Sequence, residues 1–179
     1  MITQIRQIIT GHDENGKSIL VSDHVMEPVQ VAAIYGSEFY MVWGTEGPEA
    51  RVGMSAEGPT TTPFFPRLGG TRFVLLRYAP DSSVPENIGD PDEVAAEVAE
   101  KLDGMFEPFE AGNPKMHTTD SIDYAFCVEG EMWMELDDGQ EVHLTPGTCL
   151  VQRGTRHAWH NRSDKPSLML YVLVGASRS

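Results

Sequence analysis

Short runs in which apolar and polar residues alternate occupy much of the chain and predict β-strands. The alternation is clearest after Ile122, where six runs are typical of strands: Tyr124–Val128, Met132–Leu136, Glu141–Leu144, Thr148–Val151, His157–Trp159 and Ser167–Val174. Gly, Pro and Asp residues separate these runs, and Asp138-Gly139 is a strong two-residue hairpin signal. Many short strands at even spacing predict a β-sandwich or barrel.

The first half of the chain mixes strand patterns with a long loop. Strands are expected at Ile2–Thr10, Ser18–Ser22 and Thr71–Ala79, and a hairpin at Val29–Tyr35 with Glu38–Trp43. Gly44–Gly70 is rich in Gly, Pro and Thr and lacks periodicity, so it predicts an ordered loop anchored by Phe64 and Phe65.

One segment has helical periodicity. Asp90 suits an N-cap, Pro91 the first helical position, and Gly104 the stop. Apolar residues recur at every fourth position between them, at Val94, Val98 and Leu102. The pattern predicts one short amphipathic helix packed on the outside of a sheet.

Composition and charge narrow the class of protein. The 179 residues are 40% hydrophobic and 22% charged, which suffices for a packed core. A formal charge of −14 argues against nucleic acid and anionic membranes as partners. No apolar run approaches the roughly 20 residues of a membrane span. Cys127 and Cys149 lie outside zinc-ligand spacing, so we expect free thiols and a cytoplasmic protein.

Strand parity suggests where a functional site lies. In a strand around Asp123, that residue shares a face with Ala125 and Cys127, whereas Tyr124 and Phe126 lie opposite and are expected in the core. His117 precedes this strand, and His157 begins a later one. Two imidazoles and one carboxylate suit Fe, Mn, Ni or Zn. The alternative is a set of hydrogen-bonded polar residues in a barrel mouth.

The spacing of these residues resembles the two motifs of the cupin superfamily. The first cupin motif, G-x5-H-x-H-x3,4-E-x6-G, is matched by His117-Thr118-Thr119, three residues, Asp123, six residues and Gly130. The second, G-x5-P-x-G-x2-H-x3-N, is matched by Gly147, four residues, Gln152-Arg153-Gly154, two residues, His157, three residues and Asn161. The resemblance covers about residues 110–174 directly.

The resemblance implies an all-β double-stranded β-helix, or jelly-roll barrel. The predicted organisation is an N-terminal strand-rich extension at 1–70, packed on a cupin barrel at 71–179 in a single folded unit. It also implies one divalent transition metal held by His117, Asp123 and His157. Thr119 stands where the family has a second histidine, and Gln152 replaces the proline of the second motif.

Three functions remain open. The first is a metal-dependent enzyme acting on a small aromatic or oxo-acid molecule, dioxygenase-like or lyase-like, with Thr119 and Asp120 in catalytic roles. The second is a metal-free acid–base enzyme resembling cupin epimerases, which the missing histidine favours. The third is a small-molecule-binding module without chemistry. We place Cys127, Trp159 and Arg153 in the substrate pocket, the arginine as a carboxylate clamp.

The resemblance also bears on assembly. Cupins commonly dimerise through strands outside the barrel. Ile2–Thr10 is a strand positioned to add to a neighbour's sheet, so we expect a homodimer that binds a small molecule.

Overall fold

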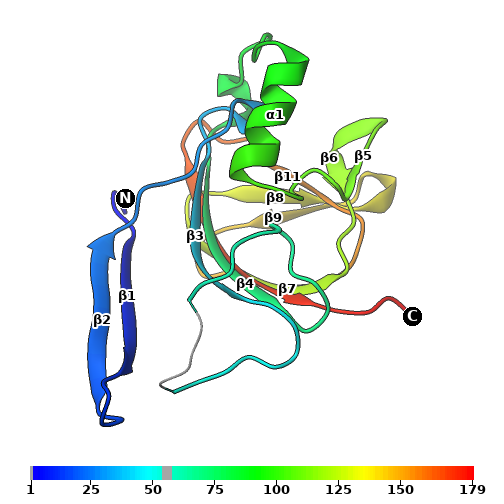
Figure 1. Ribbon diagram of the computed structural model, residues 1–179. Coiled ribbons are helices and arrows are strands. Elements are labelled where there is room, and N and C mark those ends of the chain that lie inside the picture. The colour runs from blue at the N-terminus through cyan, green and yellow to red at the C-terminus, as the bar shows by residue number, and fades with distance from the viewer. Residues whose placement is uncertain (1, 54–57) are drawn as a thin grey trace.

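The computed structural model describes residues 2–53 and 58–179, and β-strands dominate it (Figure 1). The strands are β1 (Arg6–His12), β2 (Ser18–Val25), β3 (Glu38–Thr45), β4 (Thr71–Tyr78), β5 (Phe109–Glu110), β6 (Asn113–His117), β7 (Ser121–Glu129), β8 (Met132–Glu135), β9 (Glu141–Leu144), β10 (Cys149–Arg153), β11 (Ala158–His160) and β12 (Ser167–Gly175). The helix α1 spans Pro91–Lys101, and 3₁₀ turns lie at η1 (Ala32–Ile34), η2 (Asp81–Ser83) and η3 (Asp137–Gly139).

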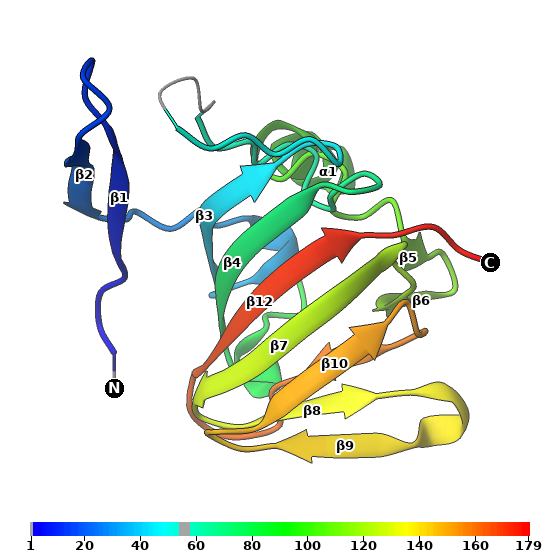
Figure 2. The same ribbon diagram turned by 90° about the horizontal axis from the view of Figure 1, so that it is seen from below.

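Two antiparallel sheets form the walls of the molecule. The larger sheet has the strand order β10-β7-β12-β4-β3 (Figure 2). The smaller sheet has the order β11-β8-β9. The predicted strands after Ile122 all form, with ends that differ by up to three residues. The all-β prediction is therefore confirmed, and the one predicted helix is α1.

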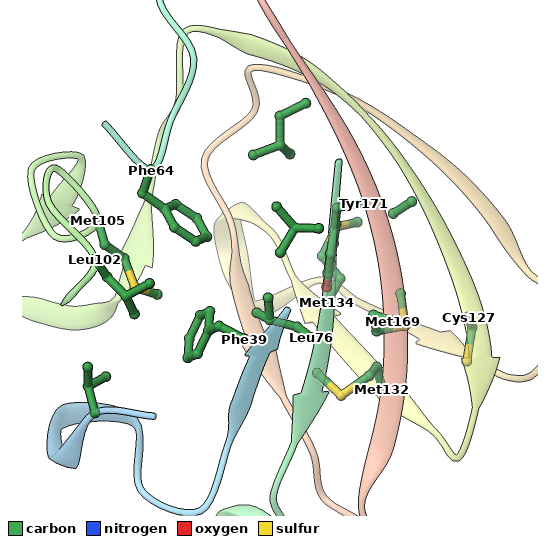
Figure 3. Packing of buried hydrophobic residues seen from close by; sticks show 14 of the residues in the cluster. Phe39, Phe64, Leu76, Leu102, Met105, Cys127, Met132, Met134, Met169 and Tyr171 are labelled. Carbon is green, nitrogen blue, oxygen red and sulfur yellow. The ribbon is translucent and has the colours of Figure 1, made fainter. Parts of the chain in front are cut away.

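The core lies between the two sheets. The larger sheet contributes Leu76, Met169 and Tyr171, and the smaller contributes Met132 and Met134 (Figure 3). These side chains come from alternate positions of their strands, as period-two patterning requires. The two sheets thus bury one shared apolar layer.

Parity on β7 is as predicted, but the outer face of that strand is not in the core. Asp123, Ala125 and Cys127 are buried, whereas Tyr124 and Phe126 are exposed. The expectation that these two aromatic residues pack in the core was wrong. They are apolar, but they lie on the outer side of the sheet, where the described residues leave them exposed.

The N-terminal half departs from the prediction in the bounds of its first two strands, since β1 begins four residues later than predicted and β2 ends three residues later, and in one element. Val29 forms a single antiparallel bridge with Phe39, and the chain then enters η1 instead of a strand. The carboxylate of Glu97 on α1 accepts a hydrogen bond of 2.8 Å from the Ala32 amide, which fixes this turn. The predicted hairpin with Glu38–Trp43 therefore has only one regular arm.

The hairpin of β1 and β2 stands away from the rest of the molecule in both views (Figures 1 and 2). In contrast, β3 pairs with β4 along its whole length and is part of the larger sheet. The predicted boundary between an N-terminal extension and the barrel, at residues 70 and 71, stays a prediction. The strand β3 lies before this boundary and is nevertheless part of the larger sheet.

The described parts of the 46–70 loop are held down by a buried arginine. The Arg72 guanidinium donates to the Pro63 carbonyl at 2.9 and 2.8 Å, to the Thr45 carbonyl at 3.1 Å, and pairs with Glu46. The Phe64 amide donates to the Asp103 carbonyl beyond α1 at 2.7 Å. These contacts press the loop onto the barrel, as predicted from its phenylalanines.

Helix α1 begins as predicted. The Asp90 carboxylate accepts hydrogen bonds from the amides of Asp92 and Glu93, at 3.0 and 3.3 Å. Val98 and Leu102 are buried in the core cluster. The helix therefore packs its apolar stripe against the cluster that also contains Phe64.

Candidate functional site

A cavity of about 240 Å³ opens into the barrel beside the 46–70 loop. Aromatic and aliphatic side chains form most of its wall: Ile34, Phe64, Phe65, Val74, Leu76, Tyr78, Met105, Phe106, Phe109, Trp159, Tyr171 and Leu173. Polar side chains also line it, among them His117, Asp123, Gln152 and His157. A concave, mainly apolar cavity with a few polar groups is typical of a site for a small organic molecule.

Backbone pairing brings the two predicted histidines together. The amides of His117 and His157 donate to each other's carbonyls at 2.9 and 3.0 Å, in an isolated antiparallel bridge. Their rings then lie with centroids 4.0 Å apart. Phe109 stacks on the His117 ring at 4.3 Å, which fixes the plane of that imidazole.

Each imidazole donates from the same ring nitrogen. Nδ1 of His117 donates to the Lys115 carbonyl at 3.2 Å, and Nδ1 of His157 donates to the Thr155 carbonyl at 2.9 Å. A carbonyl can only accept, so both Nδ1 atoms carry hydrogen and both neutral rings keep an Nε2 lone pair. Burial lowers the pKa of His117, and burial together with the neighbouring His117 lowers the pKa of His157 to about 3. Both rings are neutral at pH 7.

Asp123 extends from the inner face of β7 into the same cavity. Its Oδ1 atom is buried and has no hydrogen-bond partner. Burial raises the pKa of this carboxyl group to about 6, an effect that Ser121 partly opposes. A carboxylate with an unpartnered oxygen in an apolar cavity can accept a proton from a bound molecule.

The predicted metal ligands share the cavity but do not form a metal centre. Among residues 2–53 and 58–179, no group of three or more His, Cys, Asp or Glu side chains is arranged to hold an ion. His117 and His157 offer two nitrogen donors. The Thr119 hydroxyl, at the position of the missing ligand, instead accepts a hydrogen bond of 2.9 Å from Ser121. A metal would need a third donor to join the histidine pair.

The two predicted catalytic residues do not line the cavity. Thr119 is buried behind it, in contact with Ser121. The side chain of Asp120 is 66% exposed and pairs with Arg178 at 2.8 Å. The chain turns between His117 and β7, so these residues follow the bend outward while Asp123 points inward. The assignment of Asp120 beside the site is corrected accordingly.

Two of the three predicted pocket residues also lie elsewhere. Cys127 has the predicted parity, but it is in the core next to the Gly130 turn, with Sγ 3.6 Å from the Gly130 carbonyl. Parity fixes the face of a strand and not the depth along the barrel. Arg153 pairs with Ile122 in the sheet and is exposed, whereas Gln152 points inward. Trp159 lines the cavity as predicted.

The structure adds three polar residues that the sequence analysis did not place in the site. Gln152 lies opposite Asp123 in the sheet register, and Tyr78 and Tyr171 share a hydrogen bond of 3.0 Å inside the cavity. Parity from the known inward positions would have identified Gln152. The tyrosines come from β4 and β12, and their meeting depends on strand order, which the sequence pattern does not contain.

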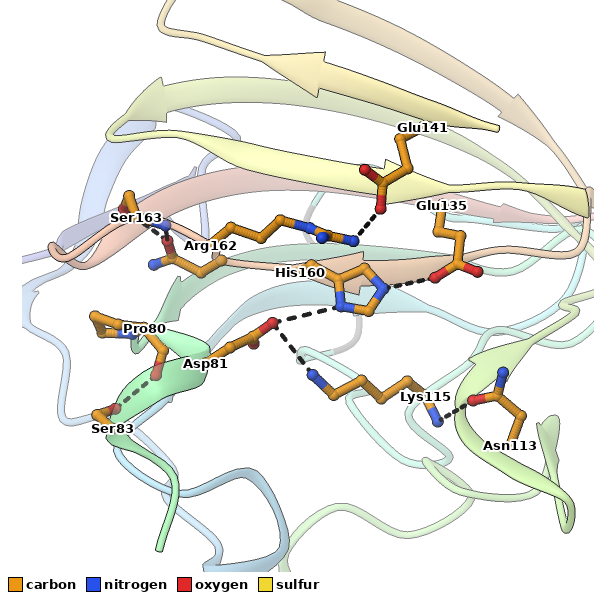
Figure 4. A network of polar contacts seen from close by, with 11 residues as sticks. Pro80, Asp81, Ser83, Asn113, Lys115, Glu135, Glu141, His160, Arg162 and Ser163 are labelled. Atoms are coloured by element: carbon orange, nitrogen blue, oxygen red, sulfur yellow. Dashed lines mark hydrogen bonds and ion pairs between the residues drawn. The ribbon is translucent and has the colours of Figure 1, made fainter. Parts of the chain in front are cut away.

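Charged side chains surround one side of the cavity. Asp81 contacts Lys115 at 3.2 Å and His160 at 3.4 Å, and His160 also contacts Glu135 at 2.9 Å (Figure 4). Asp81 and Lys115 line the cavity, and the side chain of Lys115 is half-exposed. This network ties η2, β6, β8 and β11 together around an apolar interior.

Comparison with known proteins identifies the domain. Residues 104–173 match the family model described as Cupin domain. The chain contains a cupin domain. The matched segment includes β6, which carries His117, and β7, which carries Asp123. It also includes His157, which directly precedes β11. The jelly-roll barrel expected from the motif resemblance is thereby confirmed.

Relatives extend this likeness over nearly the whole chain. Phomopsin biosynthesis cluster protein C' of Diaporthe leptostromiformis is 28% identical over 172 residues, which cover 95% of this chain and 78% of that protein. The cupin-domain-containing oxidoreductase virC of Hypocrea virens is 28% identical over 169 residues, covering 93% and 73%.

A solved structure with a similar outline is a putative ethanolamine utilization protein from Salmonella typhimurium. It has a TM-score of 0.45 and 8% identity over 98% of this chain and all of that one. Within the part of the chain that the structure describes, no helix is long and apolar enough to cross a membrane.

Proposed function

We propose that this chain is an enzyme that acts on a small, largely apolar organic molecule by removing a proton with Asp123. The observation that carries the proposal is the Asp123 Oδ1 atom, which is buried and lacks a partner, on a side chain that lines a largely aromatic cavity. A positioned base of this kind accelerates proton transfer by roughly 10²- to 10⁴-fold.

The neighbouring groups support this role. With both Nδ1 atoms bonded to carbonyls, the two Nε2 lone pairs can accept hydrogen bonds from a substrate hydroxyl. The apolar wall excludes water, which strengthens the electrostatic interactions inside the cavity. The raised pKa of Asp123, about 6, leaves the group ionised at pH 7 and basic enough to take a proton.

The test is hydrogen exchange at carbon. The protein is incubated in D2O with simple carbonyl compounds, such as cyclohexanone and phenylacetaldehyde, and deuterium incorporation is followed by mass spectrometry. Asp123→Asn should lower the catalysed rate by about 100-fold or more. Asp120→Asn is the matched control, because that carboxylate is exposed and outside the cavity. Exchange that Asp123→Asn leaves intact would refute the assignment.

A second candidate is a metal-dependent oxidoreductase or lyase, dioxygenase-like or decarboxylase-like, acting on an aromatic or oxo-acid compound. The paired histidines favour it, since two convergent imidazoles are good ligands for Fe, Mn, Ni or Zn. The names of relatives such as virC, an oxidoreductase, point the same way. His117 and His157 would hold the ion, which would act as a Lewis acid.

Metal analysis separates the two candidates. Protein purified without chelator is assayed for bound metal, and exchange is measured before and after exhaustive chelation. The acid–base proposal expects exchange to survive chelation. Loss of activity on chelation, restored by one metal and absent in His157→Ala, would establish the second candidate instead.

A further inference from the structure

Two buried phenols meet inside the cavity. Tyr78 on β4 and Tyr171 on β12 come from neighbouring strands, and their hydroxyl oxygens lie 3.0 Å apart. Both side chains line the cavity. No other hydrogen bond to either hydroxyl is recorded among the described residues, so the pair is closed on itself.

The pair retains one unused hydrogen. Each hydroxyl carries one hydrogen, and a single shared bond uses only one of the two. The remaining hydrogen has no acceptor from the described residues, although buried donors usually find one. A bound molecule that places an oxygen atom at the pair would satisfy it.

Tyr171 is the member of the pair nearer to the proposed base. The strand β12 lies directly beside β7, where Tyr171 is paired with Ala125 and Leu173 with Asp123. Tyr171 also interacts electrostatically with Asp123. Burial raises the pKa of both phenols, so each remains protonated and able to donate at neutral pH.

We propose that Tyr78 and Tyr171 form a relay that donates a hydrogen bond to a substrate carbonyl oxygen, which makes carbonyl compounds with an apolar body the substrate class of this cavity. The inference rests on the proposed function of Asp123. Tyr78 donates to Tyr171, and Tyr171 donates to the carbonyl. Asp123 takes the proton from the adjacent carbon, the C–H electron pair becomes the C=C bond, and the carbonyl π pair moves to oxygen. Return of a proton to that carbon restores the carbonyl compound, with its hydrogen exchanged for one from solvent, and needs no oxidant.

Binding of acetophenone and α-methylstyrene tests the relay without depending on catalysis. The two molecules have nearly the same shape, but only acetophenone carries the carbonyl oxygen. In the double variant Tyr78→Phe/Tyr171→Phe, acetophenone affinity should fall about tenfold, the value of one hydrogen bond. Affinity for α-methylstyrene should not change. The carbonyl infrared band of bound acetophenone should shift to higher wavenumber in the double variant, because the hydrogen bond is lost.

The single tyrosine variants show which hydroxyl donates to the ligand, and Asp123→Asn separates the relay from the proposed base. Tyr171→Phe should weaken acetophenone binding more than Tyr78→Phe, since Tyr171 is the donor to the ligand. Equal losses for both ligands, or no band shift in the double variant, would overturn the relay. Asp123→Asn should leave the band shift intact while abolishing deuterium exchange, so failure of the proposed base and failure of the relay give different results.

Discussion

Arg72 does not line the cavity, but its buried guanidinium holds in place the loop that supplies part of the cavity wall. Its side chain is 0% exposed, and its guanidinium donates to the Thr45 carbonyl just before the 46–70 loop and to the Pro63 carbonyl within that loop. That loop supplies Phe64 and Phe65 to the cavity wall. A planar group with five donors can hold several carbonyls at once, which lysine cannot.

Arg72→Leu should therefore destabilise the protein by about 3 kcal/mol, because the Pro63 and Thr45 carbonyls would lose their donor in a buried setting. The free energy of unfolding in urea is the measurement. Arg6→Leu serves as the control: its pair with Asp23 is largely exposed and should contribute less than about 1 kcal/mol. Similar losses in the two variants would show that Arg72 does not anchor the loop.

At the same scale, the sequence located some site residues and missed others for definite reasons. His117, Asp123 and His157 have fixed spacing within recognisable motifs, and all three line the cavity. Asp120 and Arg153 were placed by proximity in sequence, but a bend and a one-residue change of parity direct them outward. In a strand, one residue of error exchanges the two faces.

At the scale of elements, the sequence pattern predicted those strands and the helix that depend on residues close together in the chain. The six strands after Ile122 follow from alternation and turn residues, and α1 follows from its cap and stripe. The segment Val29–Tyr35 has a strand-like composition, yet it forms η1 because α1 offers the Glu97 carboxylate to its amide. The contact crosses 65 residues, so no local window contains it.

The N-cap of α1 provides a test at this scale. Asp90→Ala removes the acceptor of the Asp92 and Glu93 amides and should lower the free energy of unfolding by about 1 kcal/mol. Glu100→Ala, at an exposed position late in the same helix, should change it by less than about 0.5 kcal/mol. The measurement is the urea midpoint followed by far-UV circular dichroism. No loss for Asp90→Ala would mean that packing of Val98 and Leu102 alone fixes the helix.

For the molecule as a whole, the strand order is the property that sequence patterns did not contain. It places Tyr171 on β12 between β7 and β4, beside both Ala125 and Val74. The cavity results from that order. The pattern of β12 does not show which of its faces is buried. Ser167–Val174 is an almost continuous apolar run, which is typical of a strand covered on both faces.

Burial of the site also makes the stability of the whole molecule depend on pH. Asp123 has its pKa raised from 3.8 to about 6, so the folded state keeps a proton that the unfolded state has lost. Its contribution is largest below pH 3.8 and declines by about 3 kcal/mol as the pH rises to 6. His157 has its pKa lowered from 6.5 to about 3, so the unfolded state takes up the proton first. Its contribution is complete above pH 6.5 and declines as the pH falls.

Between pH 4 and pH 6 these two contributions have opposite slopes of about 1.4 kcal/mol per pH unit and nearly cancel. Removing one of them should expose the other. Relative to the wild type, Asp123→Asn should gain about 3 kcal/mol of unfolding free energy as the pH rises from 4 to 6, and His157→Gln should lose a similar amount. Urea denaturation at pH 4, 5 and 6 gives both differences, and subtraction of the wild type removes the exposed carboxylates common to all three proteins. Differences of the same sign, or differences that do not change with pH, would mean that Asp123 and His157 are not held in the cavity as a protonated acid and a neutral base over this range.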